Sequence, residues 1–537
     1  MTPLLHAAFA CILAVALLQV AARRLEVAPS IVMLVAGGAL SFVPGFSSIV
    51  LEPDLVLLVL LPPLLYTAGV GLSWRGFRDN LRPILLLAIG CVVFTAVAVA
   101  AVCHWLFGLP WAAGMVLGAI VSPPDAVAPL AIARRLGLPE RIETVLTGES
   151  LVNDATALVL FSFALGWMAG QAFEPAAMAV RFAAILASEI GWGFALGWLV
   201  LRLRARMHDA GPETLLALAT PFAAFWPPHA TGGSGVVAAV VAGLYVSWNG
   251  PRFIRPDTRL QGFFVWRTLT ATIESLVFLL TGLQASRLLA AQGGGRLGEW
   301  LLAGAAITAV VVAVRFVWVF PATYLPRLSR AFAARDPAPT WQTPFFIAFT
   351  GLRGVVSLAA ALSIPAALPD RDWLLFVTFF VIAATLLGLG GALPAMMRWL
   401  GLGEAGAHEA AARKAEEQRV RIAGIDAALA RLDVLERAGA PAHSVATLRR
   451  RHEDRRRHLV ATADPDDARD PVGDTTRLQL ELVEAERAAL AESHARGAVG
   501  DEARRRIERE LDLEDARVRH AGTSVSIRGA TADGPSA

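Results

Sequence analysis

The chain has 537 residues, of which 55% are hydrophobic and only 17% are charged. This balance excludes an ordinary soluble globular protein and a disordered one, and it indicates a membrane protein. The net charge of +3 does not point to nucleic acid, and the three cysteines, Cys11, Cys91 and Cys103, have no metal or redox spacing. We therefore expect no cofactor and interpret the cysteines as apolar filler.

Apolar segments recur through residues 1–403, and a bilayer-spanning helix takes roughly 20 such residues. We predict thirteen spans, at 4–22, 27–44, 54–71, 82–107, 111–132, 144–169, 177–201, 213–227, 233–248, 265–287, 299–325, 344–366 and 373–398. The eighth and ninth are short and flank Pro227 and Pro228, so twelve is the alternative count. Residues 1–22 lack a basic stretch ahead of the apolar run, which favours a first span over a cleaved signal peptide.

Arginines gather in every second connection between these spans, for example Arg23 and Arg24, then Arg202, Arg204 and Arg206. The intervening connections carry few. Because basic loops stay in the cytoplasm, thirteen spans put the N-terminus outside and the C-terminal tail inside, whereas twelve would break the alternation.

The fifth predicted span contains Pro123 and Pro124 immediately before Asp125. Two prolines withdraw two backbone donors, so we predict that the helix opens there into two halves. The carboxylate would compensate the positive end of one half-helix. Because ionisable groups inside a membrane are costly, Asp125 is also a candidate ion ligand.

The sixth predicted span carries four polar residues on one helix face: Glu149, Ser150, Asn153 and Asp154. Asp154 is the leading candidate for a carboxylate that binds either a cation or a proton. Asn153 would add an oxygen ligand without a second charge, so one proton would exchange for one monovalent cation. The alternative is a buried polar patch that only joins neighbouring helices.

Polar residues in three further places carry weaker signals. Thr67 follows a proline pair in the third span, and Glu274 lies alone in the tenth; each is a candidate for gating or for a structural role. Ser234 and His229 within WPPHATGGSG could suggest a serine protease, but their place at a span end favours a Pro/Gly turn.

The twelfth predicted span places Arg353 between Gly351 and Gly354. A fixed positive charge at membrane depth needs a carboxylate, and we predict an ion pair with Glu149 that leaves Asp154 free. If spans one to six and spans eight to thirteen are two repeats, the interrupted fifth and twelfth spans occupy equivalent positions. The single seventh span between the repeats gives them opposite orientations in the membrane. That pattern is typical of a secondary-transporter site.

These stretches resemble the bacterial branch of the monovalent cation:proton antiporter-1 family. The matching segments are LPPLLYTAGVGLSWRGFRDNLRPI (61–84), GAIVSPPDAVAPLAIARRLGLP (118–139), TGESLVNDATALVLF (147–161), ESLVFLLTGLQ from Glu274, and GLRGVVSLAAALSIP (351–365). They cover roughly residues 1–400, and the Asn-Asp and Gly-Leu-Arg-Gly segments are the most specific.

The resemblance implies a homodimer in the plasma membrane with core and dimerisation domains, crossed unwound helices, alternating access and electroneutral exchange of Na+ for H+. By position it implies four ion-site residues: Asp125, Asp154, Asn153 and Ser150. Na+ would bind the two aspartates. It also implies that Glu149 and Arg353 form a stabilising ion pair. Family members often have Thr at Pro124 and an acidic residue near Tyr66 and Thr67, so Na+, K+ and Li+ are all candidate substrates.

Residues 404–537 differ abruptly from 1–403, because they are dense in Arg, Glu, Asp and Ala. We predict an all-α membrane domain followed by a helical cytoplasmic tail, with a break at 464–474 and a disordered end over the last 17 residues. The competing functions are K+/H+ exchange and a tail-regulated cation channel or sensor. A channel would need a filter-like loop or acidic rings, which this sequence lacks.

Overall fold

The computed structural model describes residues 2–25, 27–46, 51–290, 296–334, 336–368, 370–461, 471–496 and 498–526. Within these ranges the chain is helical, and the one bridge of strand type is an isolated pair between Pro124 and Arg353. The expected all-α class is therefore confirmed. The chain separates into two compact units, Met1–Glu409 and Ala410–Ala537.

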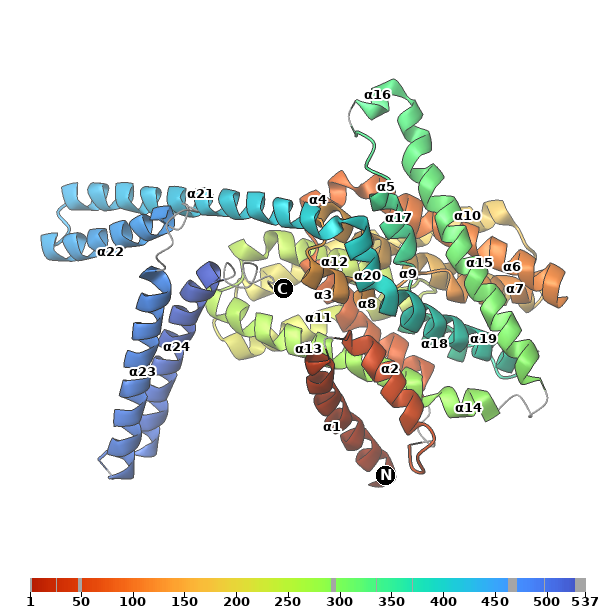
Figure 1. The fold of residues 1–537 in the computed structure, drawn as a ribbon, viewed down its shortest axis with the longest axis horizontal. Helices are drawn as coiled ribbons and strands as arrows, with labels where there is room; N and C mark the ends of the chain where they lie inside the picture. Colours follow the sequence, from red (N-terminus) through yellow and green to blue (C-terminus); the bar gives the residue numbers. More distant parts are fainter. Residues whose placement is uncertain are drawn as a thin grey trace, which may run out of the picture. The chain divides into compact units, whose positions relative to one another are not determined.

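The first unit contains helices α1 to α20 and the start of α21 (Figure 1). The first nine are α1 (Thr2–Arg24), α2 (Pro29–Leu40), α3 (Leu61–Gly71), α4 (Trp74–Asp79), α5 (Leu81–Leu85), α6 (Val92–Phe107), α7 (Trp111–Val121), α8 (Val127–Ala133) and α9 (Glu140–Met168). Then follow α10 (Pro175–Arg204), α11 (Ala210–Ala230), α12 (Val236–Asn249), α13 (Pro256–Leu283), α14 (Ala285–Ala290), α15 (Leu297–Tyr324) and α16 (Arg330–Ala333). The last are α17 (Gln342–Phe349), α18 (Val355–Leu362), α19 (Arg371–Ala384), α20 (Gly390–Leu400) and α21 (Leu402–Arg437).

Short turns of other helix types extend several of these helices. Leu55–Leu60 is π-helical and leads into α3, Leu86–Cys91 is π-helical and joins α5 to α6, and Thr385–Leu389 is π-helical and joins α19 to α20. A 3-10 turn, Arg134–Leu136, follows α8.

Six helical stretches in the described part of the chain are long and apolar enough to cross a membrane: 81–107, 140–168, 175–204, 258–290, 297–328 and 371–400. They coincide with the fourth, sixth, seventh, tenth, eleventh and thirteenth predicted spans. Of the other predicted spans, the first lies in α1, which has 23 residues, and the eighth lies in α11, which has 21. The rest hold shorter or interrupted helices, such as α2, α3 and α7. Six long apolar helices suit a membrane protein, while thirteen crossings and inverted repeats stay predictions.

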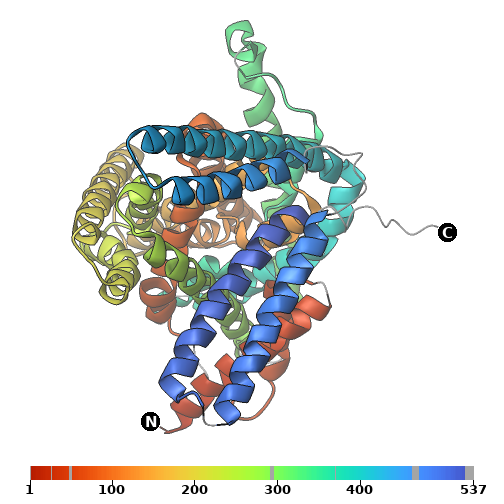
Figure 2. The same ribbon diagram turned by 90° about the vertical axis from the view of Figure 1, so that its left-hand side faces the viewer.

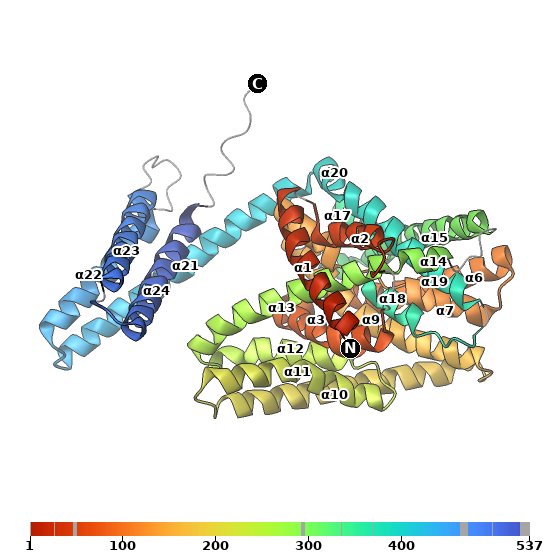
Figure 3. The ribbon, with the colours of Figure 1, turned by 90° about the horizontal axis from the view of Figure 1, so that it is seen from below.

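Two groups of helices flank the interrupted ones. Helices α6, α7, α15 and α19 share one buried apolar cluster that includes Val116, Ile307 and Val377. Helices α10, α11 and α12 lie side by side in Figure 3, and α13 packs along α2 through Leu279 and Met33. Of the half-helices, α8 packs on α20, and α18 packs on α19, α7 and α13.

The connection between the eighth and ninth predicted spans differs from the expectation. Pro227 and Pro228 lie inside the last turns of α11, and the break falls later, where Gly232 and Gly235 have φ values of 86° and 72°. Pro227 cannot donate to the Ala223 carbonyl, which instead accepts a hydrogen bond from Trp192 Nε1 at 3.1 Å. An outside donor thus lets the helix continue through the prolines.

The second unit consists of paired helices (Figure 2): the distal part of α21 with α22 (Ala442–Ala461), and α23 (Pro471–Ala495) with α24 (Asp501–Ser526). Arg449 joins the first pair through Asp433 at 2.7 Å and Glu436 at 2.8 Å. Of the break predicted at 464–474, residues 464–470 lie outside the described residues and 471–474 belong to α23. Helix α24 continues to Ser526, and the rest of the predicted disordered end lies outside the described residues.

Candidate functional site: a crossing of two interrupted helices

Two interrupted helices meet backbone to backbone in the first unit. One break separates α7 from α8, and the other separates α17 from α18. Between them Pro124 and Arg353 form an antiparallel bridge, in which the Asp125 amide donates to the Leu352 carbonyl at 2.7 Å. Both interruptions fall where the sequence predicted them, and the structure brings them together.

The close approach at this crossing requires glycine at position 354. A Cβ atom built on Gly354 would lie 2.5 Å from both Cβ and Oδ2 of Asp125. That separation is far inside van der Waals contact. The Gly-Leu-Arg-Gly segment is therefore part of the surface that holds the Asp125 side chain.

The backbone groups released by the breaks find side-chain partners. The Pro124 carbonyl accepts from Asn153 Nδ2 at 2.7 Å, and the Arg353 amide donates to Thr385 Oγ1 at 3.1 Å. The Arg353 guanidinium donates to the Ser122 carbonyl. Buried backbone groups without partners would be costly, so these side chains stabilise the opened conformation.

Asp125 caps the second half-helix, as predicted. Its Oδ1 accepts a hydrogen bond from the Val127 amide at 2.9 Å, in the first turn of α8. The next amide, that of Ala126, points to Ser150 Oγ at 3.5 Å, the outer limit of a hydrogen bond. The carboxylate thus lies at the positive end of a short helix and beside α9.

Helix α9 presents two polar groups whose oxygens are unpaired among the described residues. Asn153 is fully buried, and its Oδ1 has no hydrogen-bond partner there. Asp154 is half-buried and makes no hydrogen bond or ion pair with any described residue. The Asp125 and Asp154 carboxylates lie within electrostatic range of each other. The crossing therefore gathers oxygen acceptors without a basic side chain bonded to either aspartate.

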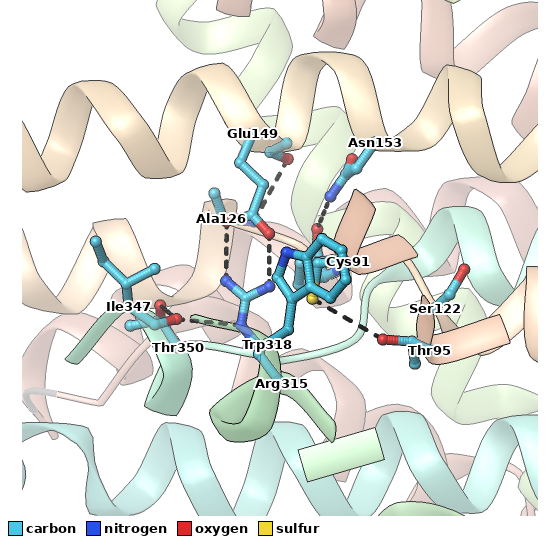
Figure 4. A network of polar contacts seen from close by, with 12 residues as sticks. Cys91, Thr95, Ser122, Ala126, Glu149, Asn153, Arg315, Trp318, Ile347 and Thr350 are labelled. Carbon is cyan, nitrogen blue, oxygen red and sulfur yellow. Dashed lines mark hydrogen bonds and ion pairs between the residues drawn. The ribbon is translucent and has the colours of Figure 1, made fainter. Parts of the chain in front are cut away.

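The predicted ion pair between Glu149 and Arg353 is wrong, because Glu149 pairs with Arg315 of α15. The Arg315 Nη1 and Nη2 atoms lie 2.5 and 2.8 Å from the two Glu149 carboxylate oxygens, in the bidentate arrangement of Figure 4. Both side chains are only 2% exposed, and Arg315 Nε donates to the Ile347 carbonyl at 3.1 Å. Arg353 is occupied by the Ser122 carbonyl instead.

Arg315 is the residue that the sequence reasoning missed. Its signal was a single arginine within the apolar run 299–325, which is as costly in a membrane as the carboxylates that were noticed. The pair joins α9 to α15 and, through Ile347, to α17. It neutralises Glu149 and leaves Asp154 as the unpaired carboxylate on that face.

Neither gating candidate is hydrogen-bonded to Asp125, Asn153 or Asp154 in the described part of the chain. Thr67 Oγ1 donates back to the Pro63 carbonyl at 2.8 Å within α3, which satisfies a local backbone group. Glu274 of α13 lines a pocket that also contacts Val127 and Ala128 of α8, and its charge is within electrostatic range of Asp125. A gating role for either residue stays a prediction.

The WPPHATGGSG segment forms a turn around another buried carboxylate. Glu189 of α10 accepts hydrogen bonds from the amides of Ser234, Gly235 and Val237 at 2.6, 2.9 and 3.1 Å, and from Ser234 Oγ. His229 stacks on Phe225 instead of facing the serine. The Ser234 hydroxyl is thus bound to a helix-capping glutamate, which supports the turn interpretation.

Chemically, the crossing offers oxygen ligands of the kind that hard cations prefer. The Asp125 and Asp154 carboxylates can take up a proton, and a proton on Asp154 removes the charge that would attract a cation. The Asn153 amide oxygen can donate electron density to a cation in either case. The arrangement therefore suits a group that binds H+ or a small monovalent cation in turn.

Comparisons with known proteins give one matching family and several named relatives. The family of transmembrane sodium/hydrogen exchangers matches residues 10–399. A Mycobacterium tuberculosis protein named as the uncharacterized Na+/H+ exchanger Rv2287 is 34% identical over 525 residues, 95% of each chain. The Na+/H+ antiporter ApNhaP of Aphanothece halophytica is 31% identical over 386 residues, 72% of each chain.

The fold also resembles a solved structure. The sodium proton antiporter MjNhaP1 of Methanocaldococcus jannaschii superposes with a TM-score of 0.58, covering 75% of this chain and 98% of that one. The two sequences share 16% identity. At that identity the likeness concerns the arrangement of helices alone.

Proposed function

Since this chain belongs to the sodium/hydrogen exchanger family, and so to the cation/proton antiporters rather than the enzymes, we propose that it exchanges Na+ for H+ at the helix crossing. The observation that supports this is that the Asp154 carboxylate, within electrostatic range of Asp125, and the Asn153 Oδ1 atom have no hydrogen-bond or ion-pair partner in the described part of the chain. In this proposal Na+ is the transported substrate and binds at the crossing only during part of each transport cycle. Ser150, next to the Ala126 amide, is the fourth contact in this proposal.

Competition between the two ions at one carboxylate couples their movements, and the proton gradient drives the exchange. Asp154 without a proton attracts Na+, whereas a protonated Asp154 has lost the charge that binds the cation. Release of one ion therefore favours binding of the other. A site that opens to one side of the membrane at a time then couples inward proton flow to outward Na+ flow.

Charge pairing supports a one-to-one, electroneutral cycle. Glu149 is neutralised by Arg315, and Asp125 is held at the start of α8 by the Val127 amide. Asp154 is then the acidic group whose charge is exchanged, so each cycle returns one proton for one monovalent cation. Two exchangeable carboxylates would instead allow two protons per cation and move net charge.

K+/H+ exchange is the second candidate function, and the presence of Pro124 next to Asp125 is the observation that supports it. The ring of Pro124 supplies no side-chain oxygen, and its carbonyl is taken by Asn153. A cation at this crossing therefore has fewer protein oxygens than one beside a threonine, and the preference between Na+ and K+ depends on ligand number and cavity size.

The test is exchange in proteoliposomes with an imposed pH gradient, with Na+, Li+ or K+ added outside. We expect Na+ to dissipate the gradient for the parent protein, and Asp154→Asn to abolish that response because Asn cannot hold a proton. Asp79→Asn is the matched control, since that side chain is 66% exposed. Cation-evoked proton movement that survives in Asp154→Asn would rule out this carboxylate.

Stoichiometry is read in the same vesicles. The rate of Na+-evoked proton movement is measured with the membrane potential held at zero by valinomycin and equal K+ on both sides, and again without valinomycin. An electroneutral exchanger has the same rate in both conditions. A rate that falls as potential builds would show that net charge moves, contrary to the one-to-one cycle.

A further inference from the structure

The first two turns of α21 pack on the segment that joins the two helices of the candidate site. That segment leaves α8 through the turn Arg134–Leu136, passes Gly137 to Pro139, and enters α9 at Glu140. The contacting residues of α21, 402–409, belong to the membrane unit, because the boundary between units falls after Glu409. The start of the tail is therefore built into the unit that holds Asp125 and Asp154.

Contact between these segments is closest at Gly406. A Cβ atom at that position would lie 1.7 Å from the Gly137 carbonyl oxygen and 2.6 Å from its carbonyl carbon. One turn earlier, a Cβ at Gly403 would lie 3.0 Å from the Leu136 carbonyl oxygen. The α21 backbone thus lies directly on the connecting backbone, and no larger residue fits at Gly406 without a shift of one segment.

A hydrogen bond completes this contact at the start of α9. The N-cap residue is Pro139, which has no side-chain acceptor for the first amides of the helix. Glu409 supplies one from α21, because its Oε2 accepts from the Glu140 amide at 2.9 Å. A carboxylate at that end also opposes the helix dipole favourably.

Buried apolar side chains also join the start of α21 to the α8–α9 connection. Leu138 of the connection and Leu402 of α21 are each 5% exposed and belong to one cluster with Ala133 at the end of α8 and Leu400 at the end of α20. Glycine contact, capping and apolar packing therefore all act on residues 133–140.

We propose that Gly406 and Glu409 are positioning residues for exchange. The connection joins the far end of α8, which begins directly after Asp125 and Ala126, to α9, which carries Asn153 and Asp154. Its placement therefore bears on the distance between the two carboxylates. The first turns of α21 hold that connection in place, although they touch neither aspartate. This inference rests on the exchange function proposed above.

Full-length variants in proteoliposomes test it. Gly406→Ala places a methyl group against the Gly137 carbonyl, and Glu409→Ala removes the acceptor for the Glu140 amide. Matched controls on the same helix are Gly424→Ala, where a Cβ meets nothing within 4 Å, and the exposed Glu404→Ala. The readouts are the Na+ KM, the maximal rate and the pH profile of exchange.

We expect Gly406→Ala and Glu409→Ala to raise the Na+ KM and shift the pH profile, with about ten-fold lower Vmax/KM, since small displacements of a site lower its efficiency steeply. Both controls should match the parent. Unchanged KM and pH profile in both test variants would overturn the proposal. Should Gly406→Ala fail to accumulate, Glu409→Ala decides, because it removes only a surface acceptor.

Amide hydrogen exchange separates this proposal from the function itself. Peptides covering 122–130 and 137–145 should exchange faster in Glu409→Ala than in the parent and in Glu404→Ala. Loss of protection confined to 137–145 would mean that α21 does not reach the site and would refute positioning. A parent protein without cation-evoked proton movement would refute the proposed function. The amide exchange measurement would still show whether α21 stabilises the α8–α9 connection.

Discussion

At the scale of single residues, the Arg315–Glu149 pair is the most buried charged contact among the ion pairs of the described chain. Two charges removed from water need each other, and removal of one partner leaves the other unpaired at high cost. The bidentate geometry adds direction to the attraction, so it fixes the rotation of α9 relative to α15.

We expect Arg315→Met to lower the free energy of unfolding by about 3–5 kcal/mol, since Glu149 would stay buried without a partner. Thermal unfolding in detergent, followed by binding of a thiol dye to the buried cysteines, measures the loss. Arg296→Met is the control, because that arginine and its partner Glu299 are 71% and 69% exposed and such pairs contribute little. A larger loss for Arg353→Met than for Arg315→Met would contradict the pairing.

Residue types and spacing predicted part of this site and missed the rest for a physical reason. Asp125, Asn153 and Asp154 were predicted because polar side chains beside prolines, or on one face of an apolar helix, can be recognised along the chain; their role as ion ligands stays a prediction. The partner of Glu149 could not be chosen that way, since Arg315 and Arg353 are both single charges in apolar segments. Which of them reaches Glu149 depends on packing between distant helices.

At the scale of elements, the crossing depends on broken helices whose backbones exchange a hydrogen bond. Proline pairs and glycines are visible in sequence, so the two interruptions were predictable, but their contact at Pro124 and Arg353 is not a local property. A side chain of α9 satisfies the Pro124 carbonyl at the first break, and a side chain of the π-helical turn after α19 satisfies the Arg353 amide at the second. Neither interruption could persist alone in a membrane.

Gly354→Ala should therefore reduce cation exchange strongly while Gly388→Ala leaves it unchanged. The added methyl carbon would lie 2.5 Å from Asp125 Oδ2, whereas at Gly388 it would meet nothing within 4 Å. We expect at least a ten-fold loss of Vmax/KM, because the carboxylate must move from its place beside α8. Parent-like exchange in Gly354→Ala, measured in the same proteoliposomes, would show that the close approach is not needed.

At the scale of the whole molecule, the chain combines an apolar unit with a charged helical one, and the composition changes near residue 404 while the compact units divide after Glu409. Arginine placement predicts that the tail is cytoplasmic and the N-terminus outside. A homodimer follows only from the family resemblance and stays a prediction.

Protease protection in oriented membrane vesicles tests the predicted orientation. Helix α22 carries the triplets Arg449–Arg451 and Arg455–Arg457, which trypsin can cleave. We expect trypsin to remove the tail in inside-out vesicles and to leave it intact in right-side-out ones. Tail cleavage in sealed right-side-out vesicles, with a soluble cytoplasmic marker still protected, would show that the tail lies outside and that the predicted orientation is wrong.

The hydrogen bond from the Asp125 amide to the Leu352 carbonyl has one more consequence. This main-chain bond ties the two broken helices together, so neither can slide past the other while it exists. In the proposed exchange cycle, a motion that turns the site from one face of the bilayer to the other would then carry both helices as one body. The bound cation would be transported along with the oxygens that hold it, and would not be passed from one set of ligands to another.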